Sequence, residues 1–124
     1  MNSIKSFEDL EVFQRAYKAS LQIHNLSLQM PKQEQFNGIA DQIRRASKGI
    51  CANVAEGFGK QYLSKKEFLR YLTIAIGSAN EMRVWLRYAY DLGYLEESNW
   101  TYLKQEYVEI AKMLSGLHKS WQGL

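Results

Sequence analysis

Residues 42–60 of the chain are QIRRASKGICANVAEGFGK, and this stretch has the clearest helical pattern in the sequence. At 3.6 residues per turn its aliphatic side chains repeat along one stripe, which we expect to be buried. The stripe consists of Ile43, Ala46, Ile50 and Val54. Three cations fall on the opposite side, namely Arg44, Arg45 and Lys48. The stretch therefore predicts a helical scaffold with a positively charged face, and it argues against a pocket of catalytic groups.

The composition is that of one water-exposed globular domain. The 124 residues are 46% hydrophobic, and Pro31 is the only proline. No segment approaches the ~20 consecutive apolar residues of a membrane span, and the N-terminus lacks the basic and apolar blocks of a secretory signal. The single cysteine, Cys51, has no partner in the chain for a disulfide, which suits a reducing compartment. We expect a single domain over residues 1–124, located in the cytoplasm and not in a membrane.

Positive charge is concentrated in the middle of the chain. The net charge is only +3, but residues 42–90 contain nine Lys or Arg and three acids. The remaining residues contain seven bases and ten acids. This asymmetry favours a polyanion or an acidic protein as partner, although solvated helix faces give the same pattern about as often.

Four amphipathic helices are predicted, over approximately residues 7–30, 37–56, 65–92 and 99–121. Ser6 with Asp9 and Ser64 with Glu67 have the three-residue spacing of capping boxes, so we place the starts of the first and third helices there. Gly57 and Gly59 are expected to stop the second helix, and Gly93 the third.

Each predicted helix has an apolar line at three- and four-residue steps. The lines of the first, third and fourth helices are, in order, Leu10, Phe13, Tyr17, Leu21, His24 and Leu28; then Phe68, Leu72, Ala75, Ala79, Met82, Leu86 and Ala89; then Trp100, Leu103, Tyr107, Ile110, Leu114, Leu117 and Trp121. No segment alternates as a strand does, so the fold class is all-α, an antiparallel up-down four-helix bundle with short connections.

The third helix carries a second apolar line, which consists of Tyr71, Ile74, Ser78 and Trp85. In a four-helix bundle each helix keeps one outward face, so a second line favours self-association. Tight packing within one subunit is the alternative interpretation.

Four segments resemble one protein family: the stretch 42–60 quoted above, FEDLEVFQRAYKASLQI at 7–23, KKEFLRYLTIAIGSANE at 65–81 and LGYL at 92–95. The chain resembles the four-helix-bundle proteins encoded in intervening sequences of bacterial 23S rRNA genes, in order and over nearly its whole length. The resemblance implies a bundle that assembles as a ring, a pentamer. It also implies a distant relationship to the accessory variability proteins of diversity-generating retroelements, whose rings engage nucleic acid and a reverse transcriptase.

The chain departs from the family at Cys51, where members often have proline. Proline there would remove a backbone donor and bend the second helix, whereas cysteine permits an unbroken one. Any function of the family that depends on such a bend is therefore in doubt for this chain.

No catalytic or metal-binding set is apparent. Asn53 and Glu56 lie three residues apart in the Ala-Asn-x-Ala-Glu-Gly motif that ends at Gly57, and Glu81 lies on the third helix; we interpret these residues as structural pairing partners rather than an acid–base pair. His24 and His118 lack metal-ligand spacing, and Cys51 has no neighbouring histidine in the sequence. We predict no enzyme activity, no metal and no cofactor.

The candidate nucleic-acid-binding residues are the cations around the second and third helices and one aromatic residue among them, which can stack on a base. They are Arg44, Arg45, Lys48, Lys60, Tyr62, Lys65, Lys66 and Arg70, with Arg83 and Arg87 forming a separate i,i+4 pair.

Two functions remain open. The first is a non-enzymatic, oligomeric helical scaffold that binds nucleic acid, structured RNA or DNA, through this basic face. The second is a protein-interaction module that recruits a nucleic-acid-processing protein such as a reverse transcriptase. The orientation of Arg44 and Arg45 separates the two, because exposed arginines support nucleic-acid binding and buried ones support an interface.

Overall fold

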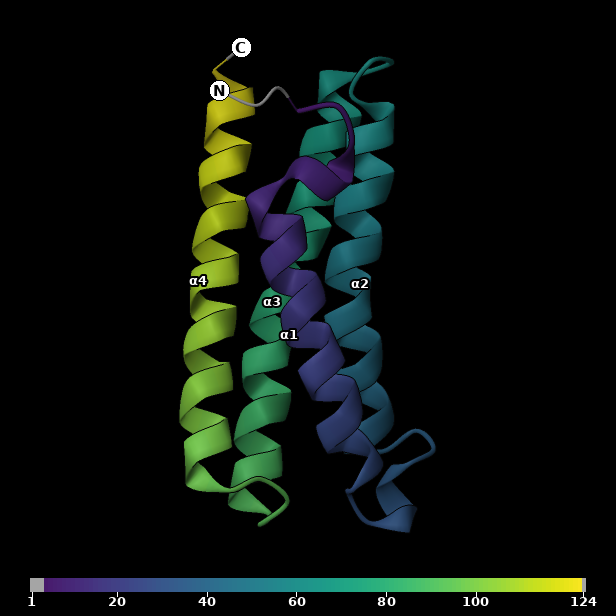
Figure 1. Ribbon diagram of the computed structural model, residues 1–124. Helices are drawn as coiled ribbons and strands as arrows, with labels where there is room; N and C mark the ends of the chain where they lie inside the picture. The colour runs from purple at the N-terminus through teal and green to yellow at the C-terminus, as the bar shows by residue number, and fades with distance from the viewer. Residues whose placement is uncertain (1–3, 124) are drawn as a thin grey trace.

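The computed structural model describes residues 4–123, which form four antiparallel α-helices and no strand (Figure 1). The helices are α1 (Glu11–Leu28), α2 (Ile39–Lys60), α3 (Lys65–Asp91) and α4 (Glu97–Gln122). Two short 3-10 turns, η1 (Phe7–Asp9) and η2 (Lys32–Glu34), precede α1 and α2. The all-α class and the four helices predicted from the sequence are therefore confirmed.

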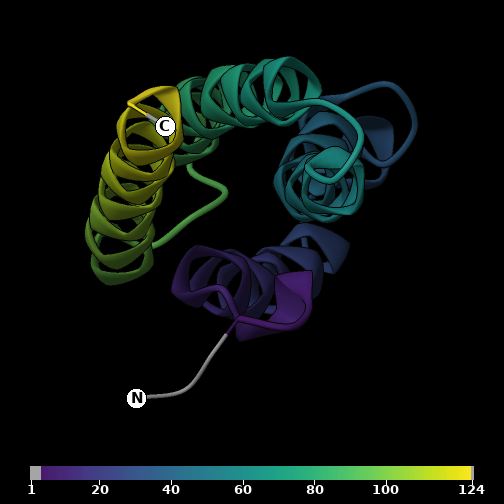
Figure 2. The same cartoon turned by 90° about the horizontal axis from the view of Figure 1, so that it is seen from above.

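Consecutive helices lie side by side around the bundle axis (Figure 2). Aromatic pairs join α3 and α4 near both ends. The rings of Phe68 and Trp121 pack edge to face with 4.8 Å between their centres, and the rings of Tyr90 and Trp100 stack with 4.2 Å between their centres. The first and last helices are joined by an ion pair between Arg15 and Glu106, with 2.9 Å between Nη2 and Oε2.

The two predicted capping boxes have different outcomes. Ser64 accepts a hydrogen bond from the backbone N–H of Glu67 and starts α3 as expected, but the carboxylate of Glu67 pairs with Arg70, so only this half of the box forms. Ser6 and Asp9 also form their box, but it caps η1 and not the main helix. The chain becomes extended at Leu10, with ψ 126°, so α1 begins at Glu11 instead of residue 7.

The predicted end of the second helix at Glu56 is wrong. Gly57 and Gly59 lie inside α2, which continues to Lys60, and Cys51 lies buried in this unbroken helix. Gly57 serves a close approach between helices: a Cβ there would lie 2.7 Å from Cβ of Tyr71 and 3.1 Å from Cδ1 of Phe68. The expected stop at Gly93 is confirmed, since this residue has the left-handed φ of 81° and directly follows α3 and Leu92.

The apolar lines predicted for α2, α3 and α4 form the core. Every predicted seam residue of α3 is fully buried, and so are Ile50 and Val54 of α2. On α4 the central part of the line, from Leu103 to Leu114, is buried, and the aromatic residues at its ends are partly exposed. Each of these three helices therefore buries the apolar line that the sequence predicts for it.

The line predicted for α1 is correct only at its start, where Leu10 and Phe13 are partly buried against the core. The helix turns a different set inward, which consists of Val12, Ala16, Ala19, Ser20, Ile23 and Ser27. The predicted residues Tyr17, Leu21 and Leu28 are 51%, 50% and 58% exposed. Small side chains allow close packing of α1, and the two buried serines bond to the backbone carbonyls of Tyr17 and His24, so their hydroxyls are satisfied. The exposed face that remains on α1 therefore includes three large apolar side chains among its polar residues.

The second apolar line of α3 is mostly used within the chain. Tyr71, Ser78 and Trp85 are half-buried, and Ser78 and Tyr71 are the nearest neighbours of the α2 glycines Gly49 and Gly57. Ile74 alone of the four is exposed. The interpretation as packing within one subunit therefore accounts for most of this line.

The glycines at the end of α2 provide a matched test of the close approach. Alanine is preferred over glycine inside a helix by about 1 kcal/mol, so Gly59→Ala, which meets no neighbour, is expected to keep or raise the free energy of unfolding. Gly57→Ala is expected to lower it by about 1–3 kcal/mol, because α2 and α3 must separate to accept the methyl group. Urea denaturation of both variants measures the difference, and equal stability of the two would contradict this account of Gly57.

Candidate nucleic-acid interface

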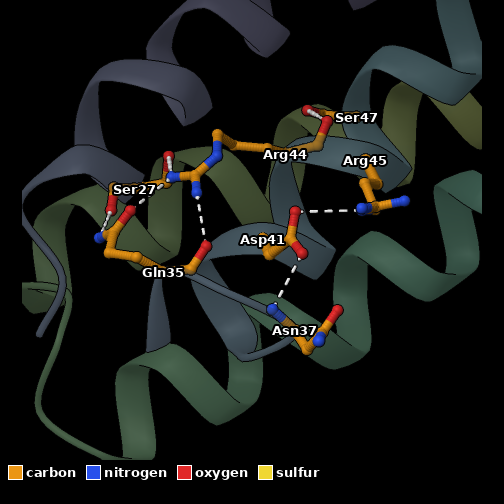
Figure 3. A network of polar contacts seen from close by, with 7 residues as sticks. All are labelled: Ser27, Gln35, Asn37, Asp41, Arg44, Arg45 and Ser47. Carbon is orange, nitrogen blue, oxygen red and sulfur yellow. Dashed lines mark hydrogen bonds and ion pairs between the residues drawn. The ribbon is translucent and has the colours of Figure 1, made fainter. Parts of the chain in front are cut away.

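Arg44 is half-buried and holds the α1–α2 connection together (Figure 3). Its Nη1 donates to Oγ of Ser27 at 2.8 Å and to Oε1 of Gln35 at 3.0 Å, and its Nη2 donates to the carbonyl of Gln35 at 3.1 Å. Gln35 in turn donates to the carbonyls of Ser27 and Met30. The guanidinium therefore points toward α1, so Arg44 supports the α1–α2 connection, and its orientation, which the sequence left open, does not favour the basic surface.

Arg45 and Lys48 are exposed, but each has a partner. Nε of Arg45 donates to Oδ1 of Asp41 at 3.0 Å, as Figure 3 shows, and its side chain is 70% exposed. The backbone N–H of Asn37, and then Arg45, hold the pKa of Asp41 below its usual value. Nζ of Lys48 lies 3.1 Å from Nδ1 of His24. Weak surface contacts of this kind are readily exchanged for contacts with a ligand.

The turn between α2 and α3 gathers exposed cations around two exposed apolar residues. Tyr62 and Leu63 are 81% and 85% exposed, and the exposed Lys65 and Lys66 come after Ser64. Neither lysine has an ion-pair partner within 4.0 Å among the described residues. Positive charge in the first turn of α3 also opposes the helix dipole, so these lysines do not stabilise their own helix.

Lys60 and Arg70 flank this turn and share one aromatic ring. Nζ of Lys60 lies 6.0 Å and Cζ of Arg70 lies 4.6 Å from the ring centre of Tyr71. Each cation also forms an ion pair with a carboxylate of its own helix. Nζ of Lys60 lies 3.9 Å from Oε1 of Glu56, and Nε of Arg70 lies 2.8 Å from Oε2 of Glu67. Arg70 holds the pKa of Glu67 below its usual value. The candidate residues thus form two groups, because Lys48 and Lys60 are separated by about 18 Å along α2.

The residues of the Ala-Asn-x-Ala-Glu-Gly motif and Glu81 do not form a second site. Nδ2 of Asn53 donates to the carbonyl of Gly49 one turn earlier, at 2.8 Å. Glu56 is exposed and pairs with Lys60. Gly57 lies opposite Tyr71, and Glu81 is ten residues farther along α3, about 15 Å away. The carboxylates of Glu56 and Glu81 are therefore too far apart to act as a pair.

The nucleophilic groups of the core are buried and protonated at neutral pH. Burial raises the pKa of the Cys51 thiol to about 11, and it raises the pKa of the fully buried Tyr107 far above its usual value. Within residues 4–123 no three His, Cys, Asp or Glu side chains gather as metal ligands would. None of the helices in this range has the length and apolar character needed to cross a bilayer.

A group of cations on α3 and α4 was missed by the sequence analysis. Arg83 of α3 lines a shallow groove together with Lys112 and Lys119 of α4. Lys112 and Lys119 are seven residues apart and therefore share a helix face, which is the signal that the sequence contained. Their alignment with Arg83 depends on how α4 is placed against α3, so periodicity within one helix did not reveal it.

The geometry defines an all-α helical protein with a basic inter-helix turn and no assembled catalytic centre within residues 4–123. The model of the 23S rRNA-intervening sequence protein family matches residues 8–116, and the chain belongs to this family. The chain is also similar to a crystal structure of a protein with unknown function from the S23 ribosomal protein family of Bacteroides thetaiotaomicron VPI-5482. That similarity has a TM-score of 0.77 at 26% identity and covers 87% of this chain and 95% of the other. No curated protein matches the sequence.

The contrasting environments of the two adjacent arginines lead to a prediction about stability. Arg44→Ala leaves Ser27 and Gln35 without their shared donor and is expected to lower the free energy of unfolding by about 1–3 kcal/mol. Arg45→Ala removes one exposed pair with Asp41 and is expected to change stability little. Chemical denaturation of the two variants measures both effects, and an unchanged midpoint for Arg44→Ala would show that its network does not stabilise the α1–α2 connection.

Proposed function

We propose that this protein is a non-enzymatic helical scaffold that binds nucleic acid, in particular structured RNA, through the turn between α2 and α3. The observation that carries the proposal is the exposure of Tyr62 beside Lys65 and Lys66, two lysines without an ion-pair partner among the described residues. Cations that track a phosphate backbone, together with an aromatic ring on which a base can stack, are the usual elements of sequence-tolerant binding. Arg45 and Lys48 form a second positive group nearer the start of α2, about 18 Å or more from Lys60.

The salt dependence of binding follows from the same residues. Each phosphate contact releases condensed counterions, so the affinity falls linearly with salt on a logarithmic scale. Contacts through lysines read charge and shape rather than base sequence. The name of the family refers to 23S rRNA, and its solved relative has unknown function, so neither one specifies the ligand.

The scaffold is proposed to act as a homo-oligomer, with the pentameric ring implied by the family resemblance as the expected form. The support comes from the exposed face of α1. Phe13, Tyr17 and Leu21 line a groove of about 520 Å³ whose other wall includes Ala52 and Ala55 of α2. Contiguous exposed apolar surface of this kind marks interaction sites in soluble proteins. In a ring each basic turn is repeated by symmetry, so weak contacts add to a higher avidity.

The same apolar groove favours a second candidate function, a protein-interaction module. An amphipathic helix of a nucleic-acid-processing partner, with apolar side chains at i, i+4 spacing, fits a groove between two helices. The two candidates differ in what the basic turn does, since the interaction module requires no affinity for RNA.

Nucleic-acid binding is tested with purified protein, a structured RNA hairpin and a DNA duplex over a salt series. The affinity is expected to fall steeply with salt, and the triple variant Arg45→Ala, Lys65→Ala, Lys66→Ala is expected to reduce the slope of log affinity against log salt by about 2–3 units. Arg44 is left in place because it supports the fold.

The matched control is the triple variant Lys5→Ala, Lys18→Ala, Lys32→Ala, which removes the same charge from exposed positions elsewhere. It is expected to change the slope less. If the wild-type protein binds neither probe at low salt, the interaction module becomes the better account.

Assembly is tested by light scattering at micromolar concentration. The wild-type protein is expected to exceed the 14.4 kDa of one chain, and Leu21→Glu is expected to return it to that mass by placing a charge in the α1 groove. Leu92→Glu, at a comparably exposed residue just after α3, is the control. A wild-type mass of one chain at every concentration would exclude the homo-oligomer.

A further inference from the structure

Two shallow hollows meet on the surface of α3. The first, of about 690 Å³, lies along α3 itself and is lined by Arg87, Tyr88 and Asp91 among others. The second, of about 410 Å³, is the groove between α3 and α4 that contains Lys112 and Lys119. Asn80 and Arg83 line both hollows, so the two form one continuous surface.

Positive charge exceeds negative charge in this surface. Arg83 and Lys119 are exposed and have no ion-pair partner among residues 4–123. Nζ of Lys112 lies 3.8 Å from Oε1 of Glu109, so this ion pair is weak. Arg87 is more firmly paired, with 2.7 Å between its Nε and Oδ2 of Asp91. Three cations from two helices are thus available to phosphate groups, while Arg87 is held beside them.

An aromatic ring lies at one end of the same surface. Tyr88 is 54% exposed, and its ring centre lies 6.1 Å from that of Trp85, tilted by 39°. An exposed ring beside arginines is suited to stack on a base and to place the attached backbone over the cations. A base within a duplex cannot offer its face to a side chain, so this geometry selects unpaired nucleotides.

The dimensions agree with a short segment of single strand. Residues 76–88 of α3 span about 18 Å, and Lys119 lies in the groove with Ile76 and Arg83. The small side chains of Ala111 and Ser115, and Gly116 with none, leave the α4 side of the groove open, which allows the backbone of a nucleic-acid strand to approach. The amide of Asn80, which lines both hollows, adds hydrogen-bonding capacity between the cations and the ring.

We propose that this surface binds a single-stranded nucleic-acid segment, with its phosphates on Arg83, Lys112 and Lys119 and a base on Tyr88. The inference rests on the proposed nucleic-acid function and specifies the form of nucleic acid that a second site takes. Lys65 and Arg83 are separated by about 27 Å along α3, so the part of this surface around Arg83 and Tyr88 is distinct from the basic turn. Lys119 lies nearer the turn, because Trp121, two residues farther along α4, packs on Phe68. A structured RNA that contacts the turn with its backbone would place an unpaired loop here.

The probes are an unstructured RNA of about twelve nucleotides, its DNA counterpart and a duplex RNA of the same length. Tyr88→Ala is expected to weaken binding of both single strands about tenfold and to leave duplex binding unchanged. Tyr88→Phe keeps the stacking surface and is expected to bind as the wild type does. The triple variant Arg83→Ala, Lys112→Ala, Lys119→Ala is expected to reduce the single-strand salt slope by about 2 units. The triple variant Lys5→Ala, Lys18→Ala, Lys32→Ala serves as the charge control, and circular dichroism verifies the fold of each variant.

The outcomes separate this inference from the function on which it rests. Single-strand binding that is unchanged in the groove triple and in Tyr88→Ala, but lost in the triple variant of Arg45, Lys65 and Lys66, overturns the α3–α4 site and leaves nucleic-acid binding at the turn. Equal losses for single strand and duplex in Tyr88→Ala overturn the selection of unpaired bases. Absence of binding by the wild-type protein to any probe overturns both proposals. A single-strand preference between RNA and DNA identifies which nucleic acid the site takes.

Discussion

Burial of one face of α3 against α2 and α4 is the constraint on which the rest of this structure depends. All seven seam residues from Phe68 to Ala89 are fully buried, and aromatic pairs join α3 to α4 near both ends. The close contact at Gly57 sets α2 beside the start of α3. Because these three helices are held tightly, the α2–α3 turn and the α3–α4 groove have defined shapes, which allows cations far apart in the sequence to act together.

The first helix is attached by a different kind of interaction. Four of the six residues on its buried face are alanine or serine, and the other two are Val12 and Ile23. Polar contacts secure the helix to its neighbours through Arg44 at the α1–α2 connection and through Arg15 and Glu106 at α4. This use of Arg44 removes one of the cations that the sequence assigned to a ligand surface. It also leaves the larger apolar residues of α1 exposed, and these are the strongest support for an assembly or a protein partner.

The cations of the surface differ in whether they already have a partner within the chain, and this difference matters more for ligand binding than their number. Arg44, Arg45, Lys60 and Arg70 each contact groups of their own chain, whereas Lys65, Lys66, Arg83 and Lys119 have no ion-pair partner within the described residues. A cation without an internal partner gives up less on binding a phosphate. The proposed contacts with nucleic acid therefore concentrate at the α2–α3 turn and at the α3–α4 groove.

The sequence by itself determined the four helices, the cap at Ser64, the stop at Gly93 and the buried lines of α2, α3 and α4. Local hydrogen bonding sets the cap and the stop, and each of these three helices buries its longest apolar line. The sequence also carried the family resemblance. Only the tertiary structure decided which line of α1 is buried, why Gly57 lies inside a helix, where Arg44 points and which cations of α3 and α4 meet. Each of these depends on the distance between two helices, and the periodicity of one helix contains no information about that distance.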